Sequence, residues 1–258
     1  MPSTELCVIH PGALSAACWA RLASHLPAGT PVKVLELETI NRFWSADPDL
    51  TVDALAERLR ARLGPARSRV IVGWGVGGVV ADALAARMAG PARRVVVLDG
   101  LAPGALVSEP DEARLLRSFA MYAGARRGRT LHVDPARLGE GLDAGLAHIL
   151  EAAATAGVLR ADTSSATVRR CYDEHAGRVL RDHRLIAEAT PTGLPLTVVK
   201  AAGSLAPESP ALGWDRFGPV ERLASAGDHY SMLTDSSSAA NLAMLLRRWL
   251  VPAFSSAA

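Results

Sequence analysis

The residues with the clearest chemical meaning lie between Arg69 and Gly78, in a run that fits two unrelated motifs. Gly73, Gly75 and Gly78 match the G-x-G-x-x-G pattern that brings a backbone close to a dinucleotide pyrophosphate. Gly73 and Gly77 match the flanking glycines of G-x-S-x-G, the turn that presents a nucleophilic serine at the end of a strand. In this second interpretation Gly75 stands at the nucleophile position. A glycine cannot attack a carbonyl, so no covalent intermediate can form there.

Two further residues could complete an acyl-transfer site. Asp99 ends an apolar run, and His229 follows the last predicted strand near the C-terminus. In such a site His229 acts as general base toward the attacking group and as general acid toward the leaving group, while Asp99 holds its tautomer and stabilises the imidazolium. The order of nucleophile position, acid and histidine is that of the α/β-hydrolase fold.

The dinucleotide interpretation also has a use for Asp99, which falls about where a ribose-binding carboxylate is expected. Two strand and helix units precede Gly73, however, whereas the fingerprint normally opens the first such unit. Trp74 would crowd the loop, and the C-terminal sequence would have no role. An NAD(P)- or flavin-binding protein using Gly73, Gly75 and Gly78 is therefore the alternative hypothesis.

The elements that must position these residues alternate between strand and helix, which predicts the α/β class. Short, continuous apolar runs suit strands buried on both faces, as in a parallel sheet covered by helices. The predicted strands are Leu6–Ile9, Val32–Leu37, Val70–Val72, Val95–Leu98, Leu196–Val199 and a weaker Val220–Leu223. Helices are predicted at Trp19–His25, Val52–Leu63, Val79–Met88 and Ala240–Leu250.

This alternation is interrupted between about residues 103 and 190, where the sequence predicts helices and only a doubtful strand at Leu131–Val133. We interpret the chain, 1–258, as one domain with a core of about 1–102 and 191–258 and a helical lid of about 103–190; two separate domains are the alternative. The predicted lid helices are Asp111–Ala123, Gly139–Thr155 and Thr163–Ile186.

The composition excludes several classes of protein. Of 258 residues 49% are hydrophobic and 21% charged, and the net charge of +2 gives no reason to expect nucleic acid or an anionic membrane as partner. There is no signal-peptide pattern and no apolar run of membrane-spanning length, so we expect a soluble, cytoplasmic protein. Cys7, Cys18 and Cys171 are widely spaced and predict buried thiols, with neither a disulfide framework nor a zinc site.

Four segments resemble the thioesterase domains that end nonribosomal peptide synthetases. The run from Gly73 to Gly78 is similar to their G-W-S-x-G-G, and Gly227 to Leu233, GDHYSML, to their G-D-H-[FY]-S-M-L. Leu98–Pro103 resembles the segment that holds their early catalytic Asp, and Ile9–Ala13 their F-H-P-x-G loop. The resemblance spans nearly the whole chain, and the lid matches in position and character.

The resemblance implies a function and a set of site residues. It implies release of a peptidyl or aminoacyl chain, by hydrolysis or cyclisation, from the phosphopantetheine arm of a carrier protein, with no other cofactor and no metal. It implies catalytic roles for Asp99, His229 and position 75, and an oxyanion hole formed by the backbone N–H groups of Ala13 and Val76. Relatives with a later Asp match less well, because the segment 200–205 holds none.

Gly75 leaves three explanations open. A serine or cysteine has been replaced; or His229 directly activates water or an amine against the thioester; or the protein holds an acyl carrier without turnover. We rank them in that order, because intact Asp99 and His229 favour the first. Direct attack would still benefit from the oxyanion hole and the histidine.

Other conspicuous residues are assigned to packing. His10 and Trp74 are expected to shape the loop and pack the turn. The lid histidines lack metal-ligand spacing, and neighbours within the cluster Cys171–His175 point in different directions on a helix. These histidines are His132, His148, His175 and His183. Packing between helices is also the expected role of the apolar lid residues Leu115, Leu116, Phe119, Met121 and Tyr122, and lining an acyl channel is the alternative.

Overall fold

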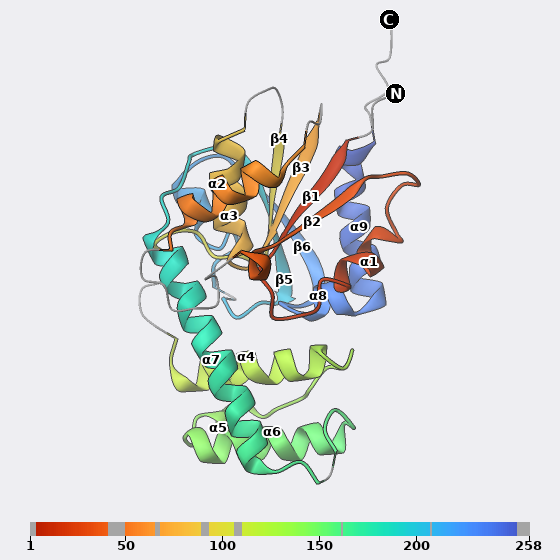
Figure 1. Cartoon of the computed structure of the whole chain (residues 1–258). Helices are drawn as coiled ribbons and strands as arrows, with labels where there is room; N and C mark the ends of the chain where they lie inside the picture. The colour runs from red at the N-terminus through yellow and green to blue at the C-terminus, as the bar shows by residue number, and fades with distance from the viewer. Residues whose placement is uncertain are drawn as a thin grey trace, which may run out of the picture.

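Six parallel strands form one sheet in the order β2-β1-β3-β4-β5-β6 (Figure 1). The computed structural model describes residues 4–40, 50–64, 68–88, 93–105, 110–160, 162–206 and 208–251. The strands are β1 (Glu5–His10), β2 (Val32–Glu36), β3 (Arg69–Trp74), β4 (Arg93–Leu98), β5 (Leu196–Gly203) and β6 (Val220–Asp228). Every predicted strand of the core is confirmed, and β6 continues beyond the predicted Leu223 to Asp228.

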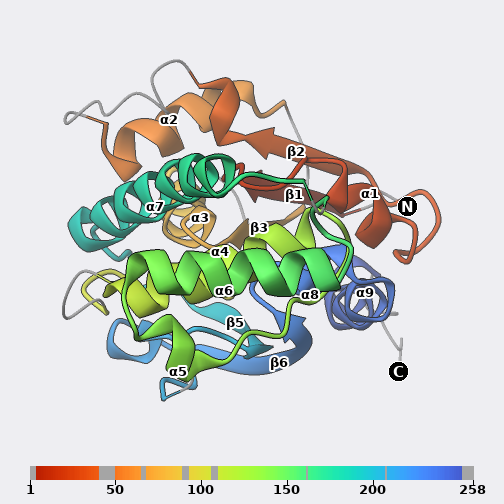
Figure 2. The same cartoon turned by 90° about the horizontal axis from the view of Figure 1, so that it is seen from below.

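Both faces of the sheet are buried, which explains the continuous apolar runs. Side chains alternate along a strand, so Leu6 and Val8 pack into one hydrophobic cluster while Cys7 and Ile9 pack into the other. Figures 1 and 2 show α1 and α9 over one face and α2 and α3 over the other. These helices are α1 (Cys18–Ala23), α2 (Val52–Arg62), α3 (Gly77–Ala86) and α9 (Ser236–Leu250), with the short α8 (Ser231–Thr234) before α9.

Among the described residues four helices lie between β4 and β5, where the sequence predicts a helical region. They are α4 (Glu112–Ala125), α5 (Pro135–Leu138), α6 (Leu142–Thr155) and α7 (Ser165–Glu188), hereafter the inserted helices. Figure 1 shows them beyond the carboxyl edge of the sheet, with α7 running back toward the core. Asp111 and Ser164 cap the first turns of α4 and α7 by accepting from the backbone N–H groups of Arg114 and Thr167.

The prediction of a weak strand at Leu131–Val133 is wrong. These residues form no strand, and Leu131 is buried with Ala153 and Val158 in a small hydrophobic cluster of the inserted segment. An apolar triplet is too short to distinguish a strand from a connecting segment that packs against a helix. The sequence also missed the single turn of α5, which Asp134 caps.

One hydrophobic cluster joins the inserted helices to the core. Phe119, Tyr122 and Tyr172 belong to the same cluster as strand residues such as Val96, and Tyr122 lies 5.9 Å, between ring centroids, from Tyr230. The packing role expected of the apolar residues on α4 is confirmed, since Leu115, Leu116, Phe119 and Tyr122 are buried and Met121 is partly buried.

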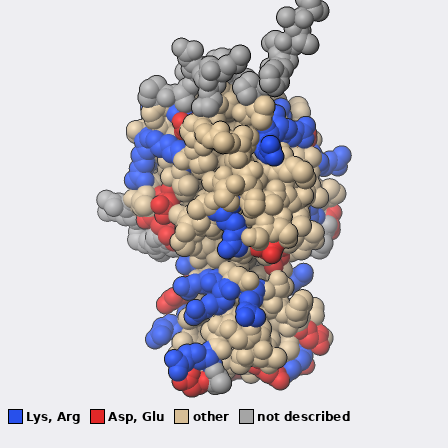
Figure 3. Space-filling model, turned by 90° about the vertical axis from the view of Figure 1, so that its right-hand side faces the viewer, with Lys and Arg blue, Asp and Glu red and all other residues tan. Residues whose placement is uncertain are grey.

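The surface and the cysteines add two constraints. On the face shown in Figure 3, Lys and Arg gather where the inserted helices approach the core. Within the described ranges no helix has the length and apolarity needed to cross a bilayer. The three cysteines are free thiols; Cys7 is buried as predicted, whereas Cys18 and Cys171 are only partly buried. Burial raises the pKa of both Cys7 and Cys18 to about 12. Neither thiol is therefore a nucleophile at neutral pH.

Candidate active site

A tight turn carries the chain from β3 into α3 and holds Gly75 at its apex. The Gly75 N–H donates to the carbonyl of Leu98 over 3.0 Å, and Gly75 has a φ of +57°, where side chains other than glycine are strained. A Cβ atom on Gly73 would collide with the carbonyl oxygen of Gly77, and one on Gly77 would lie 2.7 Å from the carbonyl oxygen of Ile9. The flanking positions therefore require glycine for want of space.

Asp99 and His229 form a hydrogen-bonded pair beside this turn. His229 Nδ1 lies 2.9 Å from Asp99 Oδ2, and Asp99 Oδ1 accepts from the Ala201 N–H over 3.1 Å. The Asp99 side chain is 3% exposed and that of His229 23%. With Nδ1 donating to the carboxylate, Nε2 is the ring nitrogen left to accept a proton.

The imidazole of His229 faces position 75. A Cβ atom built on Gly75 would lie 3.3 Å from both Nε2 and Cε1 of His229. A hydroxyl carried by that Cβ would thus be within hydrogen-bonding reach of the ring. The structure brings Gly75, Asp99 and His229 together as the sequence predicts, although their catalytic roles stay a prediction.

Asp99 is held at the end of β4 in an unusual backbone conformation. Its φ is +45°, and its N–H donates to the carbonyl of Val199 on the neighbouring strand. A non-glycine residue in this region costs on the order of 1 kcal/mol, and such residues cluster at functional sites. The conformation lets one carboxylate contact both His229 and the backbone of β5.

A second set of contacts fixes the loop that carries His229. The Asp228 carboxylate accepts from the N–H groups of Tyr230 and Ser231, which turns the chain out of β6. The Trp74 indole donates to the carbonyl of His229 over 2.9 Å and stacks on its ring with centroids 5.1 Å apart. The packing role expected of Trp74 is confirmed.

His10 shapes the loop after β1, as predicted. The Trp19 indole donates to His10 Nδ1 over 3.1 Å, so Nε2 carries the proton and donates to the carbonyl of Leu14 over 2.9 Å. Burial lowers the pKa of His10, which favours this neutral form. Ala13, which lies between His10 and Leu14 in this loop, adopts a φ of +64°.

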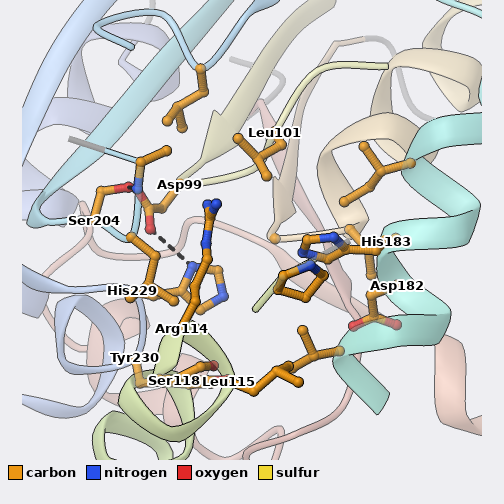
Figure 4. Close-up of a pocket in the computed structure, with 18 residues that line it drawn as sticks. Asp99, Leu101, Arg114, Leu115, Ser118, Asp182, His183, Ser204, His229 and Tyr230 are labelled. Atoms are coloured by element: carbon orange, nitrogen blue, oxygen red, sulfur yellow. Dashed lines mark hydrogen bonds and ion pairs between the residues drawn. The ribbon is translucent and has the colours of Figure 1, made fainter. Parts of the chain in front are cut away.

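One cavity contains most of the predicted site. Gly75, Val76, Asp99 and His229 all line it (Figure 4), whereas Ala13 lines a neighbouring hollow beside Tyr122. The volume of this cavity is about 120 Å³, which is small beside the usual small-molecule sites.

The inserted helices supply polar residues to this cavity that the sequence interpretation missed. Arg114 and Ser118 come from α4 and Asp182 and His183 from α7. His183 therefore lines the cavity in addition to packing. The sequence did hold a signal for the α7 residues that line the cavity, because their spacing is that of one helix face; they are Val179, Asp182, His183 and Ile186. Which face meets the cavity depends on how α7 packs.

A second serine and histidine pair borders the cavity but lacks an activated serine. Ser118 Oγ lies 3.0 Å from His175 Nε2, and both side chains are buried. Burial, together with the charges of Arg178 and His229, lowers the pKa of His175 to about 3. Such a weak base does not activate a hydroxyl at neutral pH. Within the described part of the chain His175 Nδ1 has no hydrogen-bond partner to orient it.

The remaining lid histidines form no metal site among the described residues. No group of three or more His, Cys, Asp or Glu side chains there is arranged to hold an ion. His148 Nε2 instead accepts from the Asp134 N–H and thereby links α6 to the start of α5. His132 is exposed.

The fold is that of the α/β-hydrolases, a parallel sheet covered by helices and similar to solved thioesterase structures. A four-domain nonribosomal peptide synthetase bound to AMP and glycine matches with 22% identity and a TM-score of 0.63, over 96% of this chain and 20% of the synthetase. The chain thus spans about a fifth of that protein's length.

Two separate thioesterases match over most of both chains. The NocB thioesterase domain, in covalent complex with a fluorophosphonate nocardicin G analogue, has 20% identity and a TM-score of 0.58 over 96% of this chain and 94% of its own. The RedJ thioesterase from the prodiginine biosynthetic pathway in Streptomyces coelicolor has 17% identity and a TM-score of 0.59 over 96% and 90%. No family model and no curated protein matches the sequence.

Proposed function

We propose that the protein is a thioesterase-type enzyme that releases an acyl or peptidyl chain from the phosphopantetheine thioester of a carrier protein. The observation that carries this proposal is the orientation of the His229 imidazole ring. Its Nδ1 is bound to Asp99, and the opposite edge of the ring faces the apex of the turn at Gly75. The similarity to thioesterase structures supports the same chemistry.

Because Gly75 has no hydroxyl, the attacking group is water or a nucleophile of the chain itself. His229 Nε2 takes a proton from this group as its oxygen or nitrogen bonds to the thioester carbonyl carbon. The proposed donors to the resulting oxyanion are the backbone N–H groups of Val76, which lines the cavity, and of Ala13, which lines the neighbouring hollow. The C–S bond then breaks, and the proton passes from His229 to the departing thiolate. Water gives hydrolysis, and an internal nucleophile gives cyclisation.

The space beside Gly75 suits this direct route. A CH₂OH group at position 75 would begin 3.3 Å from His229 Nε2, so its absence leaves room for a small nucleophile next to the base. The turn is otherwise that of an enzyme with a serine nucleophile, with glycines at 73 and 77. Introducing a serine should therefore restore covalent chemistry.

The test compares wild type with Gly75→Ser and the matched Gly75→Ala, each treated with a fluorophosphonate probe and measured by intact mass. We expect covalent labelling of Gly75→Ser only, because alanine introduces the same backbone strain without a hydroxyl. In parallel, thiol release from a carrier-bound acyl thioester by the wild type is expected without any acylated protein. Failure of Gly75→Ser to become labelled would falsify the proposed site.

The same samples separate the other hypotheses. Carrier affinity without thiol release in any variant would identify a binding module. A saturable change of NADH or NADPH fluorescence would favour the dinucleotide-binding alternative, although in the structure the Asp99 carboxylate is already bonded to His229 and Ala201.

A further inference from the structure

Arg114 is the one Lys or Arg side chain among the described residues that line the catalytic cavity. Its backbone N–H donates to the Asp111 carboxylate over 2.8 Å, which fixes the first turn of α4. Figure 4 draws the side chain rising from α4 toward the middle of the cavity, with Asp182 and His183 on another wall. A cation is therefore directed into the space where the substrate of the proposed reaction must lie.

The guanidinium of Arg114 has no carboxylate partner within the described ranges. Other arginines of the inserted segment do have one: Arg137 with Glu151, Arg160 with Asp162, Arg169 with Asp173 and Arg181 with Asp182. Arg114 is also half-buried. A partly desolvated cation with no carboxylate partner among the described residues favours an anionic ligand, because electrostatic attraction is stronger in a site that excludes water.

The two carboxylates among the described residues that line the cavity already have partners. The carboxylate of Asp182 is bound to Arg181 over 2.7 Å, and that of Asp99 is bound to His229. Burial, with the charge of Arg114 as a second cause, lowers the pKa of His183 to about 4, so His183 is neutral at pH 7. An anion that enters the cavity is thus attracted to the α4 wall, which holds Arg114.

Apolar side chains form the rest of the lining, including Leu101, Leu115 and Ile186. Such a cavity fits a ligand with an apolar body and one charged group. Arginine suits this role, since its planar guanidinium binds a carboxylate or phosphate through two parallel hydrogen bonds.

We propose that Arg114 binds an anionic group, a carboxylate or a phosphate, on the thioester substrate and thereby selects substrates that carry one. This inference rests on the proposed function, which supplies the thioester. The anionic group has two possible sources: a carboxylate on the acyl chain, or the phosphate of the phosphopantetheine arm. The two sources require separate arms of the experiment.

The first arm compares the N-acetylcysteamine thioester of adipic acid with its methyl ester, which removes the charge at the end of the chain. The second compares acetyl-phosphopantetheine with acetyl-pantetheine, which lacks the phosphate. In each arm the ratio of kcat/KM for the charged over the uncharged compound is measured for wild type, Arg114→Gln and Arg114→Lys. The exposed Arg117→Gln on the same helix is the matched control.

We expect one of the two ratios to fall roughly ten- to hundredfold in Arg114→Gln, the size of a lost charge-assisted hydrogen bond. In Arg114→Lys the same ratio should fall less, because lysine keeps the positive charge but cannot form the two parallel hydrogen bonds of a guanidinium. The arm that responds identifies the source of the anion. If both ratios match those of Arg117→Gln, Arg114 does not select for charge and the inference is overturned.

The inference can fail independently of the proposed function. If the wild type turns over no compound, the proposed function fails. Dissociation constants for the same compounds then still give the two ratios; they are measured by tryptophan fluorescence, to which Trp74 beside His229 contributes. If the wild type turns over the compounds but the two kcat/KM ratios do not change in the Arg114 variants, the proposed function stands and the proposed selectivity for an anionic group is rejected. Melting temperatures of all variants exclude loss of the fold as the cause.

Discussion

At the scale of single residues, Gly75 changes what the site can do without changing how the site is built. The turn, the facing imidazole and the buried carboxylate have the arrangement that we predict for a nucleophilic site, with glycine at the nucleophile position. The glycine relieves the strain that another residue would have at a φ of +57°. In the proposed reaction catalysis would therefore depend on His229 as the base, and on Asp99 as the group that sets its tautomer.

The role of Asp99 can be tested with Asp99→Asn. An asparagine oxygen can still accept from the Ala201 N–H, but the amide then donates to His229 Nδ1 and moves the ring proton to Nε2. His229 can no longer accept a proton at the edge that faces Gly75. We expect kcat for thioester hydrolysis to fall on the order of a hundredfold or more.

This prediction is checked by steady-state kinetics on a small acyl thioester, with thermal melting as the control for folding. Asp99→Ala should lose a similar amount of activity and also destabilise the fold, because the Ala201 N–H and the histidine both lose their acceptor. Activity of Asp99→Asn equal to the wild type would exclude Asp99 from the reaction.

At the scale of elements, α4 and α7 determine the character of the cavity. They are tied together by the bond between Ser118 and His175 and by the packing of Tyr122 on the His175 ring, with centroids 4.8 Å apart. Burial between these helices lowers the pKa of His175 to about 3, so His175 is neutral at pH 7 in the folded protein. Whether these helices open and close as a lid stays a prediction.

The contact between α4 and α7 should weaken in acid. The folded pKa of His175, about 3, lies below its usual value of 6.5, so its stabilising contribution is complete above pH 6.5 and is lost as the pH falls toward 3. Relative to His175→Gln, the wild type should lose up to about 2 kcal/mol of unfolding free energy between pH 7 and pH 5.

Urea unfolding at the two pH values measures this difference. The exposed His25→Gln is the matched control. An equal pH-dependent change in both variants would show that the effect does not originate at His175.

At the scale of the whole molecule, we expect the core and the inserted helices to behave as one domain. A single hydrophobic cluster contains side chains from β1, β3 and β4 together with Phe119, Tyr172 and others of the inserted helices. The segment after α7 is also anchored, because the N–H and hydroxyl of Thr192 both donate to the buried Asp82 on α3. Neither part can lose its packing without exposing apolar surface of the other.

A single cooperative unfolding transition is the expected consequence. Tryptophan fluorescence reports mainly on the core, where Trp19, Trp74 and Trp214 are buried, whereas far-UV circular dichroism also includes the inserted helices. The two signals should give the same urea midpoint. A helical signal that is lost at lower urea than the fluorescence would instead support two domains.

The sequence by itself determined the local features: the α/β alternation, the core strands and the glycines around position 75. It also determined the order in which Asp99 and His229 follow, because strand periodicity and turn glycines are properties of neighbouring residues. Only the tertiary structure decided which distant side chains share the cavity. Arg114, Asp182 and His183 enter it because of the angle at which α4 and α7 pack beyond the sheet, and no local pattern encodes that angle. Ala13, by contrast, lines the neighbouring hollow.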